Sequence, residues 1–248
     1  MLKGKTALIT GANRGIGFSI LRKFAIEGSN IIAHSRKQND IFADECNKIS
    51  EKYNIHISHV HFDLLDTVEI KKEILSIIKT KKPIDILVNS AGIIHGGLFH
   101  MSTIKSIREV FDVNFFGLLE VTQLVSKYML RNKKGSIINI SSVAGIDLSA
   151  GNCGYGTSKA AIIAFSKTLA DELSIHGIRV NVIAPSLTDT DMSKTIEAKK
   201  ERDMLSNNEG FKRMARPEEI SELVAFLGSD NSSFINGEII RVDGGNKF

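Results

Sequence analysis

Short apolar runs alternate with amphipathic segments along this chain of 248 residues, and that alternation constrains the fold more than any other feature. A buried parallel strand is typically a short, continuous apolar run, whereas a helix that covers a sheet repeats its apolar residues about every 3.6 positions. When the two alternate, each helix returns the chain to the same edge of the sheet, and the strands run parallel. The pattern therefore predicts an α/β fold in which helices cover both faces of one sheet.

Seven of the apolar runs have the character of strands, so we expect a doubly wound, parallel, seven-stranded sheet of the Rossmann type. The expected strands cover residues 5–10, 31–34, 55–62, 84–89, 135–142, 179–184 and 237–242. The expected helices cover residues 18–27, 40–53, 67–82, 103–131 and 155–176, and a further helix begins at Arg216-Pro217. Residues 187–213 are charged and weakly periodic, which is typical of a lid that follows a strand. No linker interrupts the pattern, so we expect a single domain over residues 1–248.

A glycine-rich turn joins the first expected strand to the first expected helix. Its sequence is Gly11-Ala12-Asn13-Arg14-Gly15-Ile16-Gly17. Glycines allow the backbone to approach a pyrophosphate, and the N-terminus of the following helix offers unpaired N–H groups to an anion. The spacing G-x-x-x-G-x-G differs from the usual G-x-G-x-x-G of dinucleotide sites, so a tight strand-to-helix turn without a ligand remains an alternative.

Basic residues occupy the position at which an NAD site usually carries an acidic one. That acidic residue follows the second strand and binds the ribose hydroxyls. Here Ser35-Arg36-Lys37 follows the second strand, and Arg14 lies in the glycine turn. Two guanidinium groups directed at one corner suit a 2′-phosphate, although each arginine taken alone is also compatible with a solvated surface position. Together they favour NADP(H).

The segment Tyr155-Gly156-Thr157-Ser158-Lys159 has the spacing of an acid–base pair on one face of a helix. A phenol has a pKa near ~10, and a cation fixed beside it favours the phenolate. Ser141 and Ser142, at the end of an expected strand, supply a hydroxyl that could hydrogen-bond the same substrate oxygen. The arrangement predicts delivery of a proton to an oxygen, or its removal, while another group moves on carbon.

Several other functions are disfavoured by the sequence. The net charge is +4, but basic and acidic residues are interspersed and no nucleic-acid recognition motif is present. His56, His59 and His61 lie on one expected strand, where 59 and 61 face the side opposite to 56. No carboxylate or cysteine completes a ligand set, so we expect no metal site. No apolar run is long enough to span a membrane. Cys46 and Cys153 have no C-x-x-C spacing, so we expect free thiols and a cytoplasmic location.

With these residues in place, the chain resembles the classical short-chain dehydrogenase/reductase family over essentially its whole length. The resemblance depends on motifs that occur in the family's order: Thr10-Gly11-x-x-x-Gly15-Ile16-Gly17, Asp63, Asn89-Ser90-Ala91-Gly92, Asn114, Ser142, Tyr155-x-x-x-Lys159, Pro185, Thr190 and Asp243-Gly244-Gly245. It implies a cofactor half at about residues 1–135 and a catalytic and substrate half at about 136–248, with the lid at about 187–213.

The resemblance also implies roles for individual residues. Tyr155 would be the general acid, Lys159 would lower its pKa and bind the nicotinamide ribose, and Ser142, rather than Ser141, would polarise the substrate oxygen. Asn114 would hold a water in the proton relay. Asp63 would contact the adenine, and the turn at Asn89 would face the adenosine ribose. The full set of implied cofactor-binding residues is Gly11, Asn13, Arg14, Gly15, Ile16, Gly17, Arg36, Asp63, Leu64, Asn89, Ala91, Gly92, Tyr155, Lys159, Pro185, Ser186 and Thr188.

Three departures from the family pattern are visible. Ser90 replaces an asparagine common in that turn, and Ser186 replaces the glycine usual after the proline. Within the family the chain looks most like the 3-oxoacyl-[acyl-carrier-protein] reductases, which dock an acidic carrier protein on basic residues near the ends of two long helices. Here Lys133-Lys134 stand near the end of one helix and His176 near the end of the other, where arginines are typical. The lysines keep the positive charge, whereas a neutral histidine loses it.

These observations predict an NADPH-dependent carbonyl reductase that acts on a ketone, with a 3-oxoacyl thioester as the first expected substrate and fatty-acid biosynthesis as its setting. Reduction or oxidation of a sugar, a polyol or another small metabolite is the alternative within the family. A non-catalytic NADP(H)-binding regulatory protein is the alternative outside it, which the intact Ser142, Tyr155 and Lys159 oppose. The expected partners are the substrate, an acyl carrier protein docked on Lys133 and Lys134, and further copies of the chain in a homotetramer, with no nucleic acid or membrane.

Overall fold

The seven strands form one parallel sheet in the order β3-β2-β1-β4-β5-β6-β7, as expected. The computed structural model describes residues 1–80, 82–195 and 210–245. The strand order reverses between β1 and β4, which are neighbours in the sheet although the chain passes through β2 and β3 between them. In an open α/β sheet, such a switch point leaves a crevice outside the carboxyl ends of the strands, where ligands bind.

The elements have these bounds in the structure. The strands are β1 (Thr6–Thr10), β2 (Asn30–Ser35), β3 (Ile57–His61), β4 (Ile86–Asn89), β5 (Gly135–Ile140), β6 (Ile178–Pro185) and β7 (Ile239–Val242). The α-helices are α1 (Gly15–Ile26), α2 (Asp40–Tyr53), α3 (Thr67–Lys79), α4 (Ile104–Phe111), α5 (Gly117–Asn132), α6 (Ala144–Asp147), α7 (Cys153–Ser174) and α9 (Pro217–Gly228). The short turns are η1 (Phe99–Met101), η2 (Asp112–Phe116), η3 (Met192–Lys194) and η4 (Asp230–Ser232).

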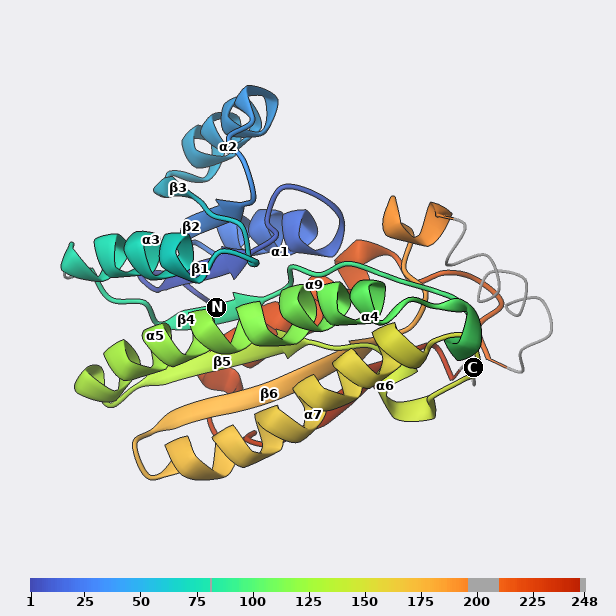
Figure 1. Ribbon diagram of the computed structural model, residues 1–248. Helices are drawn as coiled ribbons and strands as arrows, with labels where there is room; N and C mark the ends of the chain where they lie inside the picture. The colour runs from blue at the N-terminus through green and yellow to red at the C-terminus, as the bar shows by residue number, and fades with distance from the viewer. Residues whose placement is uncertain (81, 196–209, 246–248) are drawn as a thin grey trace.

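Helices cover both faces of the sheet and bury a separate apolar core on each. In Figure 1, α3, α5 and α7 lie on the face toward the viewer, and α1 and α9 lie behind the sheet. Successive residues of β1 point to opposite faces, as the period of a strand requires. Ile9 accordingly packs with Phe24 of α1 and Val224 of α9, whereas Leu8 packs in the core that contains Val121 of α5. The central strands β4 and β5 are buried along their full length, which explains why they read as continuous apolar runs.

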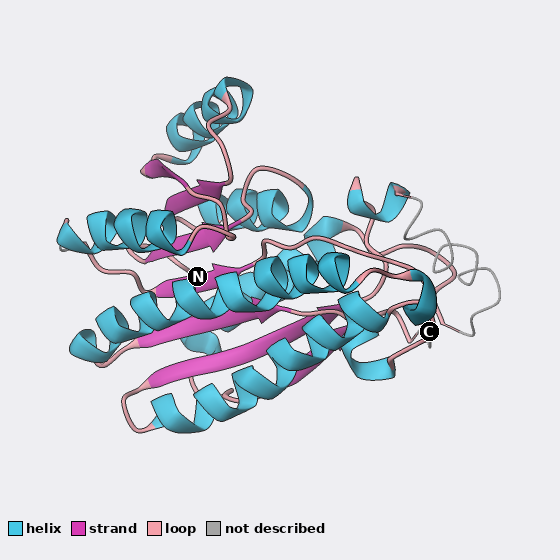
Figure 2. Cartoon of the chain, viewed as in Figure 1, coloured by secondary structure: helices cyan, strands magenta, loops and turns pink. Residues whose placement is uncertain are grey.

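The helix expected over residues 103–131 is interrupted. The structure has α4, then one wide π-helical turn over η2, then α5, in a continuous helical path (Figure 2). A π-turn inserts one extra residue into the helix, and such insertions are frequent at functional sites. Because the apolar spacing runs through the insertion, the sequence pattern alone predicted an unbroken helix.

Two further boundaries differ from the expectation in a way that affects the site. Helix α1 begins at Gly15 rather than at residue 18, so the last glycines of the turn form its first turn. Helix α7 begins at Cys153, so Tyr155 lies inside its first turn rather than opening it. Of the expected lid, residues 196–209 lie outside the described residues, and the part that precedes them contains η3.

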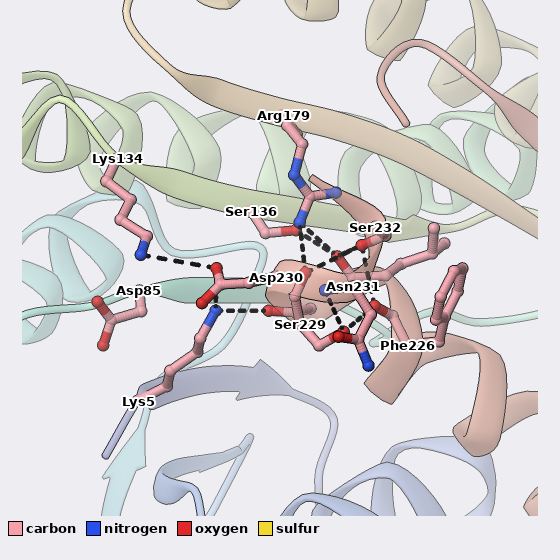
Figure 3. A network of polar contacts seen from close by, with 12 residues as sticks. Lys5, Asp85, Lys134, Ser136, Arg179, Phe226, Ser229, Asp230, Asn231 and Ser232 are labelled. Carbon is pink, nitrogen blue, oxygen red and sulfur yellow. Dashed lines mark hydrogen bonds and ion pairs between the residues drawn. The ribbon is translucent and has the colours of Figure 1, made fainter. Parts of the chain in front are cut away.

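The carboxyl end of α9 is held against the amino edge of the sheet by side chains (Figure 3). The last carbonyls of a helix have no partner within it. Here Arg179 of β6 donates to the carbonyls of Leu227 (2.8 Å) and Ser229 (3.1 Å), and the Ser136 hydroxyl of β5 donates to the Leu227 carbonyl (2.9 Å). These bonds satisfy the helix end and fix α9 behind the strands that carry the candidate site at their other end.

None of the helices within the described ranges combines the length and apolarity that crossing a membrane requires.

Candidate active site

A cavity of about 710 Å³ opens at the carboxyl ends of the central strands, at the switch point between β1 and β4. Its walls come from the glycine turn after β1, the ends of β2 and β3, the turn after β4, the segment after β5, the first turns of α7, and the segment after β6. A volume of this size suits a large organic ligand.

The glycine turn has a shape that only glycine permits at two positions. Gly11 has φ +66°, and a Cβ there would lie 2.9 Å from the Cα of Ala91. A Cβ on Gly17 would lie 2.1 Å from the Gly11 carbonyl oxygen. The Thr10 hydroxyl closes the arrangement, because it accepts hydrogen bonds from the amides of Ser90 (3.0 Å) and Ala91 (3.2 Å). The turns after β1 and β4 are therefore packed backbone against backbone beside the cavity.

The cavity is lined on this side by groups suited to an anion. The amides of Gly15 and Ile16, in the first turn of α1, make no hydrogen bond with any described residue. Arg14 and Arg36 both line the cavity and are exposed, and neither guanidinium pairs with another described side chain or carbonyl. Unpaired amides at a helix N-terminus and free guanidinium groups are the usual ligands of phosphate.

His34 lies between the glycine turn and the end of β3. The Gly11 amide donates to its Nδ1 (3.1 Å), and its Nε2 lies 3.0 Å from the carbonyl oxygen of Phe62. Burial lowers the pKa of the imidazole to about 4, so the ring is neutral at neutral pH. No sequence motif points to His34. The available signal was a polar side chain at an inward position of an otherwise apolar strand.

The two serines after β5 have different surroundings. Ser141 is 3% exposed, and its hydroxyl donates to the carbonyl oxygen of Lys159 (2.8 Å). Ser142 lines the cavity and is half-buried, and its Oγ accepts from the Ala144 amide (3.1 Å). Since its proton goes to no other described residue, the Ser142 hydroxyl can donate to a ligand, whereas that of Ser141 is already engaged.

Tyr155 and Lys159 line the same cavity one turn apart on α7. The Lys159 ammonium lies 5.7 Å from the centroid of the Tyr155 ring and donates to the carbonyl oxygen of Ile140 (3.0 Å). Lys159 is 5% exposed, and burial lowers its pKa to about 8. The ammonium is thus still mostly protonated at neutral pH, in a place where a positive charge stabilises a phenolate on the neighbouring ring.

Asn114 does not reach the cavity with its side chain. It is fully buried in the π-turn η2, where its Oδ1 accepts from the Ile93 amide (2.8 Å) and its Nδ2 donates to the Ile93 carbonyl (2.9 Å) and to the Ser158 Oγ (3.1 Å). These contacts join η2 to the turn after β4 and to α7. The side chain thus holds backbone and helix together, and a relay water held by Asn114 stays a prediction.

Nearly all of the expected cofactor-binding residues line the cavity. They are Gly11, Asn13, Arg14, Gly15, Ile16, Gly17, Arg36, Asp63, Leu64, Ala91, Gly92, Tyr155, Lys159, Pro185, Ser186 and Thr188. The exception is Asn89, whose side chain points away from the cavity and into the protein. Its Nδ2 donates to Thr122 Oγ1 (2.9 Å) and to Asn139 Oδ1 (2.8 Å), so the side chain does not face the site that the adenosine ribose was expected to occupy.

Lys133 and Lys134 lie at the opposite edge of the sheet from the cavity. They precede β5, whereas Ser141 and Ser142 follow it, and the Lys134 ammonium lies 3.6 Å from Asp230. His176 precedes β6 and belongs to the same amino edge. A carrier protein docked on these residues would therefore not face the cavity of the same chain.

Comparisons with known proteins point to one family. The family model of short chain dehydrogenases matches residues 5–201. The 3-oxoacyl-[acyl-carrier-protein] reductase FabG of Thermotoga maritima is 37% identical over 246 residues, which cover 98% of each chain. The 3alpha-hydroxysteroid dehydrogenase of Mediterraneibacter gnavus is 33% identical over 245 residues, 98% of this chain and 97% of that one. The crystal structure of levodione reductase superposes with a TM-score of 0.90 over 99% of this chain and 98% of that one, at 24% identity, which supports the fold.

Proposed function

This chain belongs to the short-chain dehydrogenase family and is an oxidoreductase of the C=O/CH–OH type, and on that basis we propose that it is an NADPH-dependent reductase of 3-oxoacyl thioesters. The observation that carries the proposal is that Ser142, Tyr155 and Lys159 share one cavity with the glycine turn. A proton donor and a dinucleotide-binding turn are thereby brought to one place, as hydride transfer to a carbonyl requires.

The described residues fit a nicotinamide dinucleotide. The absence of a side chain at Gly11 leaves the turn close to the backbone of Ala91, and the unpaired amides of Gly15 and Ile16 lie at the N-terminus of α1. A pyrophosphate suits this position, because it can approach glycine backbone closely and accept from those amides. Asp63 and Leu64, which follow β3, line the same cavity, and we expect the adenine to lie beside them.

The preference for NADPH is supported by Arg14 and Arg36. Both are exposed cations on the cavity wall with no partner among the described residues, and no carboxylate follows β2 at the position where NAD sites carry one. Charge-assisted hydrogen bonds from two guanidinium groups favour a 2′-phosphate over a hydroxyl.

The residues around the reacting carbonyl have distinct tasks. A bound nicotinamide supplies the hydride. The Tyr155 hydroxyl protonates the carbonyl oxygen, and the Ser142 hydroxyl donates a hydrogen bond to that oxygen as negative charge develops on it. The buried Lys159 ammonium stabilises the phenolate that Tyr155 leaves behind. In the reverse direction, the same phenolate would remove the alcohol proton.

The choice of substrate is supported by the relatives, several of which are named as 3-oxoacyl-[acyl-carrier-protein] reductases. The alternative is a small-molecule ketone or alcohol. The 33% identity to a 3alpha-hydroxysteroid dehydrogenase favours this alternative, because the same scaffold carries a different substrate in that protein. Docking of a carrier protein on Lys133 and Lys134, a homotetramer and a cytoplasmic location remain predictions.

Initial rates with acetoacetyl-CoA, a carrier-free thioester, and either NADPH or NADH test the proposal. We expect turnover with NADPH and a preference for it that falls in an Arg36→Glu variant. A Tyr155→Phe variant should lose most activity, whereas Tyr128→Phe, which removes only a hydroxyl that donates to the Lys82 carbonyl, should retain it. Full activity of Tyr155→Phe would contradict the mechanism. Nucleotide binding without thioester turnover would favour the small-molecule alternative.

A further inference from the structure

The buried side chain of His34 makes hydrogen bonds that have no part in the proposed proton transfer. It is 2% exposed at the carboxyl end of β2, and its ring lies against the ring of Phe62, with centroids 3.9 Å apart. Its main-chain carbonyl accepts from the Ala12 amide (2.8 Å), and its Nδ1 accepts from the Gly11 amide (3.1 Å). His34 thus accepts hydrogen bonds from the first two amides of the glycine turn.

The partners of the ring fix its protonation. The Gly11 amide can only donate, so Nδ1 carries no proton, and the Phe62 carbonyl can only accept, so Nε2 carries one. Only the neutral tautomer protonated on Nε2 satisfies both partners. Burial favours the same neutral form, since it lowers the pKa of the ring.

The two partners belong to opposite parts of the cofactor half of the cavity. Gly11 starts the turn that suits the pyrophosphate, and Phe62 immediately precedes Asp63 and Leu64. Because His34 occupies the Gly11 and Ala12 amides, the amides that remain for an anion are the later ones of the turn and those at the start of α1. The ring therefore sets which amides face the ligand and how far the turn lies from the end of β3.

We propose that His34 is a positioning residue for the dinucleotide site: its neutral ring fixes the start of the glycine turn relative to the end of β3 and thereby preorganises the pyrophosphate and adenine subsites. This inference rests on the proposed dinucleotide-dependent function. A histidine that served only as core packing would support the fold without affecting the affinity for nucleotide.

The experiment compares NADPH binding by calorimetry, without substrate, in the full-length wild type and three variants. Asparagine can place an amide oxygen where Nδ1 lies, glutamine can place its amide nitrogen near Nε2, and leucine removes both polar contacts. We expect the dissociation constant for NADPH to rise about tenfold in His34→Leu and His34→Gln, because each variant leaves the buried Gly11 amide without an acceptor. His34→Asn should stay within about threefold of the wild type for the same reason. Because His34 contacts neither Tyr155 nor Ser142, the KM for NADPH should rise in the leucine and glutamine variants by a larger factor than kcat falls.

His59→Leu is the matched control. His59 lies on the neighbouring strand β3, is partly buried, and packs edge-on against Phe42 without lining the cavity. We expect it to lower thermal stability and leave NADPH affinity intact. Wild-type affinity in both His34→Leu and His34→Gln would overturn the inference, as would equal weakening by His59→Leu. If the wild type itself bound neither NADPH nor NADH, the proposed function would fail, and the inference with it. The rescue by asparagine keeps the test decisive if the leucine variant does not fold.

Discussion

Replacing Lys159 by methionine is expected to abolish turnover without destabilising the protein. Burial lowers the pKa of Lys159 from 10.5 to about 8, so keeping the ammonium protonated at pH 7 costs the folded state about 3 kcal/mol relative to the unfolded chain. Methionine has a similar length and no charge, so this cost disappears. The Ile140 carbonyl loses its donor, which costs about 1–3 kcal/mol. The free energy of unfolding at pH 7 should therefore equal that of the wild type or exceed it by up to about 2 kcal/mol.

The pH dependence gives the sign of the effect independently. Between about pH 8 and 10.5 the unfolded chain keeps the Lys159 proton while the folded protein releases it. Because the unfolded state then binds more protons, the stability of the wild type rises with pH across this window. Relative to the methionine variant, the wild type should gain about 2 kcal/mol between pH 7 and 10. Other groups that titrate in this range are common to both proteins and cancel in the difference.

The measurements are denaturant unfolding of the ligand-free proteins at both pH values and initial rates with NADPH. We expect the rate constant to fall by about 10²–10⁴, the usual contribution of a proton-transfer apparatus. Lys167→Met is the matched control, since Lys167 is exposed on the same helix α7 and should change neither quantity. The reasoning is refuted if Lys159→Met is less stable than the wild type by more than about 2 kcal/mol at pH 7, or if the difference between the two does not change with pH.

Three further outcomes follow from the same contacts. Ser142→Ala should lower kcat/KM about 10²-fold. Ser141→Ala, which loses the hydrogen bond to the Lys159 carbonyl, should mainly lower the free energy of unfolding by about 1 kcal/mol. Similar losses of kcat/KM in both variants would contradict this assignment of the two serines. As the pH falls from 6.5 to about 4, the wild type should lose about 3 kcal/mol of stability relative to His34→Asn, because the unfolded chain gains a proton that the folded His34 does not accept. Urea unfolding of both proteins at the two pH values tests this, and an unchanged difference in stability would contradict it. Gly11→Ala should be less stable than Gly4→Ala in thermal unfolding, because both sites have positive φ but only Gly11 would also contact Ala91; equal losses would exclude the clash.

Much of the fold could be predicted because buried parallel strands leave a direct trace in the sequence. Every residue of β5 is buried, so apolar residues stand at both even and odd positions of the strand, and only Ser136 and Asn139 are polar side chains in it. The sheet of seven parallel strands and the helices on both faces are confirmed. One boundary was wrong at the start of α1, which begins at Gly15, because Gly15 and Gly17 belong both to the glycine turn and to the first turn of the helix.

The direction of polar side chains was less predictable than the elements that carry them. Asn89 belongs to the expected turn, but its amide joins Asn139, which donates in turn to Ser166 Oγ (2.8 Å) on α7. Nothing local in the sequence distinguishes an asparagine that faces a cavity from one that faces a neighbouring strand. His34 was overlooked for a related reason: its partners Gly11 and Phe62 lie far from it in the sequence, and only the parallel pairing of β2 with its neighbours brings them together.

The π-turn η2 shows that the placement of Tyr155 and Lys159 depends on more than their spacing along α7. Ser158, which lies between Tyr155 and Lys159, donates to the Tyr155 carbonyl (2.7 Å) and accepts from the Asn114 amide (3.1 Å). Asn114 in turn holds both the amide and the carbonyl of Ile93, beside Gly92. A Cβ on Gly92 would lie 3.5 Å from the Lys159 ammonium and 3.1 Å from Asn114 Oδ1. The turn after β4, the π-turn and α7 therefore meet at Lys159. Asn114 lies in the π-turn at this meeting point, and the position of Tyr155 therefore depends on three elements rather than on α7 alone.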